Sequence, residues 1–546
     1  MATEDKYDRQ LRLWGAHGQR VLSSSRILVL GAGAAASESL KNLALPGIGR
    51  FVLVDGREVA ASDVEENFFV DASAVGKSRA RVVAEYIVEL NDDVEGEAVE
   101  ADVETFALKA NLCSVLREGK YSLVIATQLS RGALVNLDSA CRAAGGIPLI
   151  ALSSFGYVGR VRISASEHCV VEAKLDPPPR TDLRLANPFP ELRKYVDSFD
   201  LVALDDYEYG HTPYVVFLIK AADHWKCEHE GCLPKTFAEK QEFKERFKSL
   251  ARRPWGEEEN LSEAVEYAYS GYTPLSLPEE VKSLFADPSL DEIQSMDPCT
   301  PRFEFWIIVA AIKEFMATVS SGLLPLSGDV PDMVSSSTAY MTLQGIYFEK
   351  AKSDREAVAD LVQKALSNLS LPPTTISSEV IDRYCKNARD LQCIRYRSVK
   401  DEVMDQTERN APENISEDLS ESVMPGLGDD GPQSPLLWYI GTRASEEFRE
   451  SCGRYPSDQR DADQVKRIAD GLAAHLGIAA NVNFSHSHAC EMVRYGSPKV
   501  ELHNTGAILG GVAAQEAVKL LTRQYIPFDN TYAFNGIACK SEVIKV

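Results

Sequence analysis

A glycine-rich turn between a short apolar run and a helical pattern constrains the fold of this chain more than any other feature. Residues 26–30 (RILVL) predict a buried strand, and residues 37–44 predict the helix that follows. Between them stands Gly31-Ala-Gly33-Ala-Ala-Ala, and Asp55 closes the next strand-like run. Glycines at such a turn let a phosphate approach the helix N-terminus, and the acidic residue can accept hydrogen bonds from a ribose. The turn predicts a Rossmann-type first unit, with a vacant βα turn as the alternative.

Alternating strand and helix patterns occupy the two ends of the chain. The first part, residues 1–168, is typical of a parallel sheet with crossover helices, and residues 481–546 return to the same pattern. Mostly helical patterns fill residues 169–400 and 435–480. Residues 401–434 carry ten acidic residues and one arginine, which predicts an acidic flexible loop. The predicted fold class is α/β, with one domain made from both ends and interrupted by a large helical insert.

Composition and charge exclude several classes. With 546 residues, the chain has room for three or four units of about 150 residues. The 58 Lys and Arg against 81 Asp and Glu give a net charge of −23, which disfavours nucleic acid and anionic membranes as partners. The 11 cysteines show no disulfide spacing, and the start is polar without an apolar leader segment. We therefore expect a cytoplasmic and nuclear protein.

Several short sequence motifs along the chain indicate a protein family more specifically than the glycine turn does. They are Tyr7 to Gly15 (YDRQLRLWG), Leu45 to Gly49 (LPGIG), Asn67-Phe68-Phe69, Gly76 to Ala80 (GKSRA), Gly510 to Lys519 (GGVAAQEAVK) and Pro527 to Phe534 (PFDNTYAF). Together they resemble the adenylation domains of ubiquitin-like-protein activating enzymes and their bacterial ThiF/MoeB-type relatives. The residues that follow Asp55 do not match those of a nicotinamide-dependent dehydrogenase, the class of protein that the glycine turn alone would allow.

Within this superfamily the chain is most similar to the regulatory subunits of the heterodimeric enzymes that activate a Nedd/RUB-type modifier, called auxin-resistance subunits in plants. The likeness runs nearly end to end and includes Asp182 to Leu185 (DLRL), Pro188 to Glu191 (PFPE) and Val330 to Met333 (VPDM). It implies an obligate heterodimer with a catalytic subunit, which adenylates the modifier with Mg-ATP, carries it as a thioester and binds zinc. Cullin neddylation through a conjugating enzyme would follow. A regulatory subunit for another modifier, such as SUMO, is an alternative.

The resemblance also shows what this chain lacks. Catalytic members carry Asn-Arg-Gln where this chain has Asn67-Phe68-Phe69, so a phosphate-binding cation is missing. They also place an Asp that supports Mg2+ after the strand predicted at 121–126, where this chain reads Ala126-Thr-Gln128-Leu-Ser. We therefore predict a degenerate nucleotide site comprising Gly31, Gly33, Asp55 and Lys77, with no cofactor bound by this chain. Asp55 and Lys77 fit surface charges equally well.

The resemblance assigns the surviving Arg9 to contact phosphate across the subunit interface, in the ATP site of the partner. An arginine supplied in trans can stabilise developing phosphate charge; the alternative is that Arg9 pairs with a nearby carboxylate. The residues that the resemblance places at the partner interface are Tyr7, Arg9, Gln10, Trp14, His211, Val330, Pro331, Asp332, Met333, Tyr340 and Leu343.

Cys299 and two sets of histidine and cysteine residues allow other interpretations of the chain. Cys299 in Asp-Pro-Cys-Thr resembles the acyl-accepting cysteine of catalytic members, and a self-sufficient adenylyltransferase using Cys299 is the main rival; we favour a buried structural cysteine. The sets His224, Cys227, His229, Cys232 and His486, His488, Cys490 lack the spacing of a zinc finger or ribbon. We predict no metal site and no catalytic residue in this chain.

Overall fold

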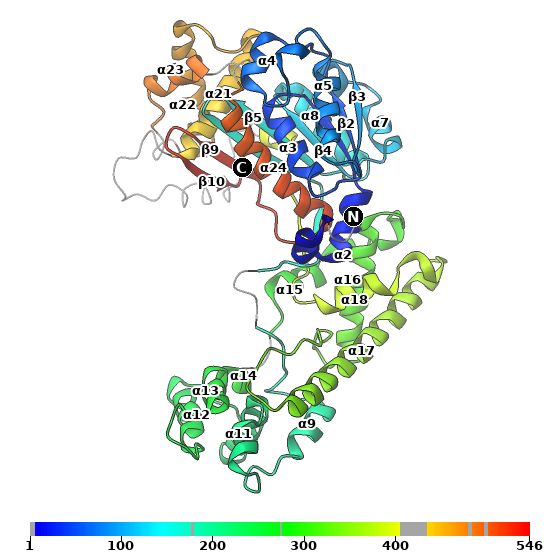
Figure 1. Ribbon diagram of the computed structural model, residues 1–546, viewed down its shortest axis with the longest axis vertical. Helices are drawn as coiled ribbons and strands as arrows, with labels where there is room; N and C mark the ends of the chain where they lie inside the picture. The colour runs from blue at the N-terminus through cyan, green and yellow to red at the C-terminus, as the bar shows by residue number, and fades with distance from the viewer. Residues whose placement is uncertain (1–5, 176–179, 274–275, 405–433, 479–482, 496–500) are drawn as a thin grey trace. The chain divides into compact units, whose positions relative to one another are not determined.

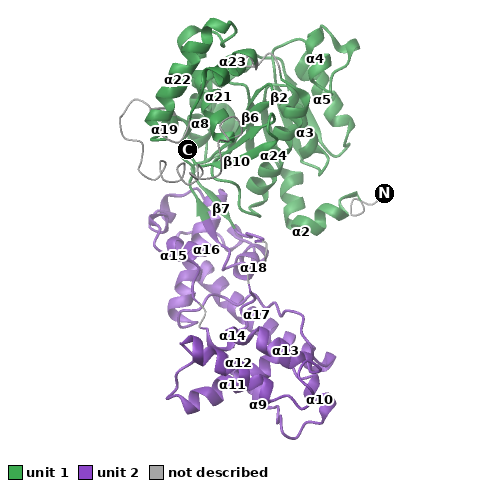
Figure 2. Ribbon diagram, turned by 90° about the vertical axis from the view of Figure 1, so that its left-hand side faces the viewer, with its two compact units in different colours: residues 1–170, 393–546 green, residues 171–392 purple. Residues whose placement is uncertain are grey.

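The computed structural model describes residues 6–175, 180–273, 276–404, 434–478, 483–495 and 501–546. The chain divides into two compact units, coloured separately in Figure 2. Unit 1 comprises residues 1–170 and 393–546, and unit 2 comprises residues 171–392. The first boundary lies beside the predicted residue 168. Among the described residues, no helix is long and apolar enough to cross a membrane.

Unit 1 is built on an eight-stranded mixed sheet in the order β10-β9-β6-β5-β4-β1-β2-β3. Its strands are β1 (Arg26–Leu30), β2 (Arg50–Val54), β3 (Glu95–Val99), β4 (Leu123–Thr127), β5 (Leu149–Phe155), β6 (Val158–Ser164), β9 (Thr531–Asn535) and β10 (Lys540–Ile544). The strands from β3 to β5 are parallel, whereas β6, β9 and β10 pair antiparallel. The two ends of the chain therefore complete one sheet, as predicted.

Helices cover both faces of the parallel part of the sheet. Ile27 and Val29 of β1 pack in one core with apolar residues of α3, α5 and α24, while Leu28 and Leu30 pack in a second core with α6, α7 and α8. This burial of alternate residues on opposite faces explains the continuous apolar run at 26–30. The helices of unit 1 are α2 (Asp8–Ser24), α3 (Ala34–Ala44), α4 (Ala61–Glu66), η1 (Ala72–Ala74), α5 (Arg79–Glu89), α6 (Val103–Ala107), α7 (Leu112–Glu118), α8 (Arg131–Ala143), α19 (Val399–Met404), α21 (Pro435–Cys452), η5 (Gln459–Asp461), α22 (Ala462–His475), α23 (His486–Tyr495) and α24 (His503–Thr522).

Residues 435–480 differ from their predicted place in the helical insert. Helices α21 and α22, which lie in this range, belong to unit 1, and their apolar residues share a core with residues of β6, β9 and β10. Figure 1 shows both helices beside the sheet of unit 1. Helical periodicity does not reveal which surface a helix covers, so the sequence pattern could not separate these helices from the insert.

The structure describes only the two ends of the acidic loop predicted at 401–434. Its first residues form α19, and Ser434 is the N-cap of α21; residues 405–433 lie outside the described residues. Glu402 forms ion pairs with Arg162 of β6 and Arg443 of α21, and Arg160 of β6 pairs with Glu446 at 2.7 Å. This buried network attaches α19 and α21 to the sheet.

Unit 2 is helical, as predicted for the insert. Its core contains large aromatic and aliphatic side chains, among them Trp225, Phe243 and Tyr347. Its helices are α9 (Pro190–Asp197), α10 (Asp206–Gly210), α11 (Tyr214–Glu228), α12 (Phe237–Ser249), α13 (Glu259–Glu266), α14 (Ala268–Tyr272), α15 (Glu279–Phe285), η2 (Pro288–Leu290), η3 (Ile293–Ser295), α16 (Pro301–Thr318), α17 (Ser337–Asn368), η4 (Pro373–Thr375) and α18 (Ser378–Lys386). Two short strands, β7 (His168–Val170) and β8 (Gln392–Ile394), pair where the chain leaves and re-enters unit 1.

Candidate functional site

The glycine turn joins β1 to α3 at the point where the strand order reverses. Strand β1 lies between β2 and β4, and in such sheets ligands bind outside the carboxyl ends of the strands at this position. Gly31 has a φ of +96°, and a Cβ there would lie 2.2 Å from the hydroxyl oxygen of Thr127 at the end of β4. Only glycine fits this turn, so the fold keeps the shape of a nucleotide site.

The carboxylate of Glu501 occupies the N-terminus of α3. Its Oε2 accepts a hydrogen bond from the backbone nitrogen of Ala34 at 2.9 Å, and Oε1 accepts one from Ala35 at 3.0 Å. A Cβ on Gly33 would lie 2.1 Å from Oε2, so the glycine makes room for this side chain. Burial raises the pKa of Glu501, and the two amide donors oppose that shift. An internal carboxylate therefore holds the amide groups that would bind a phosphate in a working site.

Asp55 is also engaged within the chain. Its carboxylate is almost fully buried and forms an ion pair with Arg79, while its Oδ2 accepts a hydrogen bond from the backbone nitrogen of Ala32 at 2.9 Å. Arg57 adds a further contact at 3.3 Å, and Arg79 also pairs with Asp63 at 2.9 Å. The buried pair with Arg79 excludes the surface-charge interpretation of Asp55. Its oxygens are committed to protein donors rather than open to a ribose.

The segment in place of the phosphate-binding Asn-Arg-Gln serves structural roles. Asn67 is buried and its side-chain amide donates to the carbonyl of Ala32 at 3.2 Å, below the glycine turn. Phe68 is 80% exposed and lies beside His503, and Phe69 packs in the core. The cation missing from the sequence is thus replaced here by an exposed aromatic ring.

The loop after β4 offers no unengaged carboxylate among the described residues. Gln128 has a φ of +58°, and its side-chain nitrogen donates to the carbonyl of Ser154 at 2.7 Å. Glu104 from α6 reaches this loop and accepts from the backbone nitrogen of Ser130 at 2.7 Å, but it pairs with Arg449 at 3.0 Å. The chemistry of these donors does not fit a divalent cation held as in the catalytic members.

Lys77 does not contribute to the cleft through any contact of its side chain among the described residues. The side chain is exposed, and only its backbone is engaged, with the carbonyl accepting from Val59 at 2.9 Å. Arg79, two residues further along, is the cation that meets Asp55. The structure therefore favours the surface-charge interpretation of Lys77.

The predicted interface residues of unit 1 lie on α2 and just before it. Arg9 is exposed and forms no ion pair with any described residue, whereas its neighbour Arg12 pairs with Asp8 at 2.9 Å. Tyr7 is buried and donates to Asp93 at 2.8 Å; Gln10 and Trp14 are half-buried. Figure 2 shows the first turns of α2 standing out from the body of unit 1. The helix thus anchors through Tyr7 and presents Arg9 to solvent.

The predicted interface residues of unit 2 differ in how far they are exposed to solvent. Met333 and Leu343 are buried in the core of unit 2, so neither is available to a partner in this conformation. Asp332 is exposed. The residues of intermediate exposure are His211, Val330, Pro331 and Tyr340.

Cys299 is exposed, so the predicted buried cysteine is wrong. It lies in the loop before α16, where its backbone nitrogen donates to Asp297 at 2.9 Å, and Thr300 caps the helix. This loop lies at the surface because the apolar residues that follow, from Phe303 onward, turn into the core and leave the cap outside.

The two histidine and cysteine sets do not converge on a common point. His229 stacks on Trp225 at 4.0 Å between ring centroids. His486 Nδ1 lies 3.4 Å from Cys490 Sγ, but His488 lies against Trp438, so the second set brings no three ligand atoms together. Among the described residues, possible metal ligands converge only at Glu167, Cys169 and Cys393. There Arg395 pairs with Glu167 at 3.1 Å, and burial raises the pKa of the Cys169 thiol well above its usual value. A paired carboxylate and a protonated thiol fit core packing better than a cation.

Sequence reasoning missed Glu501 and Arg79, the two residues that fill the cleft. Arg79 carried a signal, because it stands in the Gly76 to Ala80 phrase at the start of a predicted helix, within reach of a strand-end aspartate. Glu501 carried none, since it lies more than 460 residues from Ala34 in sequence and follows no motif.

Comparisons with known proteins agree with this geometry. The ThiF family pattern matches residues 7–543. A NEDD8-activating enzyme E1 regulatory subunit of Arabidopsis thaliana, AXL, is 38% identical over 543 residues, covering 98% of each chain. A second from the same plant, AXR1, is 38% identical over 99% of this chain and 96% of its own. The Xenopus laevis NEDD8-activating enzyme E1 regulatory subunit is 37% identical over 98% of this chain and 97% of its own.

Proposed function

We propose a function from the premise that this chain belongs to the ThiF family and, within it, to the NEDD8-activating enzyme E1 regulatory subunits. It pairs with a catalytic subunit in an obligate heterodimer. The catalytic subunit adenylates the C-terminus of a NEDD8/RUB-type modifier and carries it as a thioester, the first step of cullin neddylation. This chain catalyses neither step.

The filled cleft of unit 1 carries the proposal. Glu501 takes the amide donors at the start of α3, and Arg79 takes the carboxylate of Asp55. A triphosphate would have to displace a buried carboxylate and would meet Phe68 where a cation is needed. The nucleotide chemistry therefore belongs to the partner, which supplies Mg-ATP binding and its own zinc site.

Arg9 is this chain's contribution to the chemistry. Its side chain is exposed on the projecting helix α2, while Tyr7 two residues earlier is fixed by Asp93 and Asn91. A guanidinium presented in this way can stabilise charge that develops on phosphate in the partner's site.

The surface around α2 is suited to a large partner. Helix α24 packs against both α2 and α3. Four large apolar side chains on or next to these helices are more than a third exposed: Leu13, Leu45, Ile508 and Ile526. Apolar side chains of this size are enriched in the centre of obligate interfaces. The modifier and a conjugating enzyme then join the assembled pair, in the cytoplasm and nucleus.

Pyrophosphate exchange tests the proposal directly. The purified chain should not exchange labelled pyrophosphate into ATP with a NEDD8-type or SUMO-type modifier, whereas the complex with the catalytic subunit should do so with the NEDD8-type modifier. Exchange by the chain alone would overturn the proposal in favour of a self-sufficient adenylyltransferase.

Cys299 requires its own test because its thiol is exposed. Cys299→Ala in the assembled complex should leave thioester formation unchanged, with Cys452→Ala, another exposed cysteine, as the matched control. Loss of the thioester only in the Cys299 variant would assign the acyl-accepting step to this chain.

A further inference from the structure

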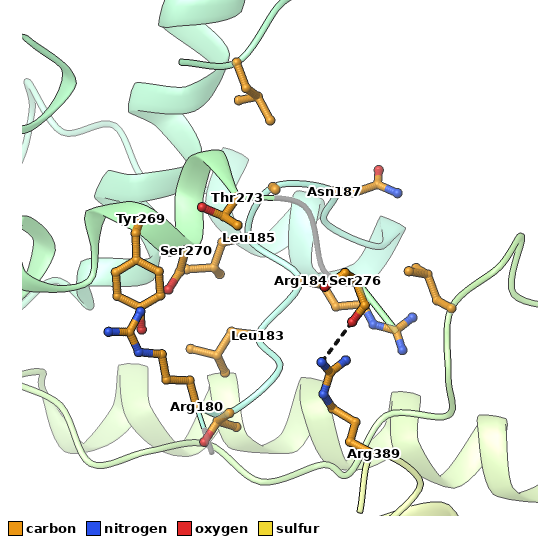
Figure 3. Close-up of a pocket in the computed structure, with 14 residues that line it drawn as sticks. Arg180, Leu183, Arg184, Leu185, Asn187, Tyr269, Ser270, Thr273, Ser276 and Arg389 are labelled. Carbon is orange, nitrogen blue, oxygen red and sulfur yellow. Dashed lines mark hydrogen bonds between the residues drawn. The ribbon is translucent and has the colours of Figure 1, made fainter. Parts of the chain in front are cut away.

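A cavity of about 460 Å³ lies within unit 2. Its walls come from the segment 180–187, from α14 and from the residues that follow α18 (Figure 3). Leu183, Leu233 and Leu323 provide apolar surface, and Ser270 and Thr273 add hydroxyl groups. Volumes of this size are typical of small-molecule sites with a few polar groups on apolar walls.

Three arginines line this cavity, and none of the described lining residues is acidic. Figure 3 shows Arg180 beside Tyr269 at one end, with Arg184 and Arg389 toward the other. This concentration of positive charge is unusual in a chain with a net charge of −23. Guanidinium groups with apolar surface between them form a site for an anion that carries a hydrophobic part.

The arginines retain capacity for hydrogen bonds. Arg180 stacks on the ring of Tyr269, with its central carbon 3.5 Å from the ring centroid, and pairs with no carboxylate among the described residues. Within the described part of the chain, Arg389 donates a hydrogen bond to the backbone carbonyl of Ser276 at 3.0 Å and to no other acceptor. Stacking and a single carbonyl acceptor leave most of the N–H donors of these two guanidinium groups unused.

Arg184 supplies an independent observation. Its side chain is more than nine-tenths buried, yet its Nε makes no hydrogen bond, and its ion-pair partner Asp182 lies 3.6 Å from that nitrogen. A buried donor without a partner is costly, and a bound oxyanion would satisfy it. Burial raises the pKa of Asp182, and the charges of Arg184 and Arg389 oppose that shift.

We propose that this cavity binds a small anionic ligand, a carboxylate or phosphate group attached to a compact apolar body. The oxyanion accepts from the guanidinium groups, and the apolar part contacts Leu183 and its aliphatic neighbours.

Calorimetric titration of the full-length chain with phenyl phosphate, and separately with benzoate, tests the site. We expect saturable binding of at least one probe, and the stronger of the two identifies the preferred oxyanion. Arg389→Gln should weaken that binding by at least about tenfold, the loss expected for one charge-assisted contact. Arg180→Gln should weaken it as well, and the double variant should abolish it.

Arg253→Gln is the matched control, because Arg253 is an exposed arginine of unit 2 that does not line the cavity. It should bind the probes like the unaltered chain, and thermal melting of each variant establishes that unit 2 remains folded. Equal affinity in the double variant would overturn the proposal. So would the failure of both probes to bind, or binding of an acidic peptide alone.

Discussion

Glu501 Oε2 lies 2.9 Å from the backbone nitrogen of Ala34, the first residue of the helix that follows the glycine turn. A carboxylate of the same chain thus stands where a nucleotide phosphate would stand in a working Rossmann-type site. The fold has kept its anion-binding geometry while satisfying it internally. Two features therefore distinguish this site: an internal carboxylate at the N-terminus of α3, and an exposed aromatic ring, Phe68, in place of a cation.

Removal of this carboxylate should reopen the anion site. In Glu501→Ala the amide groups of Ala34 and Ala35 lose their acceptor, and we expect saturable binding of inorganic pyrophosphate that the unaltered chain lacks. Calorimetric titration measures this. Glu118→Ala, an exposed glutamate at the end of α7, is the control and should not bind. Absence of binding in the Glu501 variant would show that the carboxylate is not what closes the site.

The same variant should not gain activity in pyrophosphate exchange with ATP. It still has Phe68 in place of a cation, and residues 126–130 carry no carboxylate. If the Glu501 variant binds pyrophosphate but does not exchange it into ATP, then Glu501 blocks binding and other residues account for the absence of exchange.

The buried pair of Asp55 and Arg79 should contribute strongly to the stability of unit 1. Arg79→Met removes the buried cation from the Asp55 carboxylate and leaves it the exposed Arg57, and we expect the free energy of unfolding to fall by about 3–5 kcal/mol. Arg57→Met is the control, because Arg57 contacts the same carboxylate from an exposed position and should cost less than about 1 kcal/mol. Urea unfolding measures both. If Asp55→Asn combined with Arg79→Met recovers no stability, the charge is not the cause.

Local patterns predicted the first strand and helix of unit 1 correctly, but they placed α21 and α22 in the insert. The apolar run at 26–30 and the glycine turn specify β1 and α3, because strand burial and a positive φ leave few alternatives. Strand β3 was not predicted, since Glu95 to Val99 lies at the sheet edge and carries two glutamates and a glycine. An edge strand needs no apolar run on both faces. The assignment to regulatory subunits, which rested on phrases along the whole chain, is confirmed by the relatives.

The contents of the cleft could not be predicted in the same way. A missing side chain can be recognised in the sequence because a motif fixes its position, as at Phe68. The side chain that occupies the site instead cannot be recognised, because Glu501 reaches the start of α3 only through the packing of α24 on that helix. The exposure of Cys299 illustrates the same limit, since the sequence gives the cap of α16 but not the surface on which it lies.

Arg9→Ala should separate assembly from catalysis. Arg9 is exposed and unpaired among the described residues, so its loss should leave both the fold and the heterodimer intact. Adenylate formation by the complex should slow roughly 100-fold, as expected for one donor to a charged transition state. Pyrophosphate exchange measures the rate, and gel filtration checks assembly.

Arg12→Ala provides the comparison for Arg9, because Arg12 lies on the same helix and is held by Asp8. It should behave like the unaltered complex in both assays. A normal exchange rate for the Arg9 variant would refute its role in the partner's site.

The network around Glu402 should make the stability of unit 1 sensitive to acid. Burial raises the pKa of Glu402, but Arg443, Arg162 and Arg160 outweigh it and lower the pKa to about 2, below the ordinary value of 4.5. A carboxylate with a lowered folded-state pKa stabilises the protein fully above its unfolded pKa and loses that contribution as the pH falls toward the folded value. Glu402→Gln should therefore melt at a lower temperature than the unaltered chain at pH 7, and this difference should shrink between pH 4.5 and pH 2. Glu450→Gln changes an exposed residue of α21 and should melt like the unaltered chain at each pH. If the difference in melting temperature for Glu402→Gln stays constant with pH, packing rather than the charge of Glu402 is responsible.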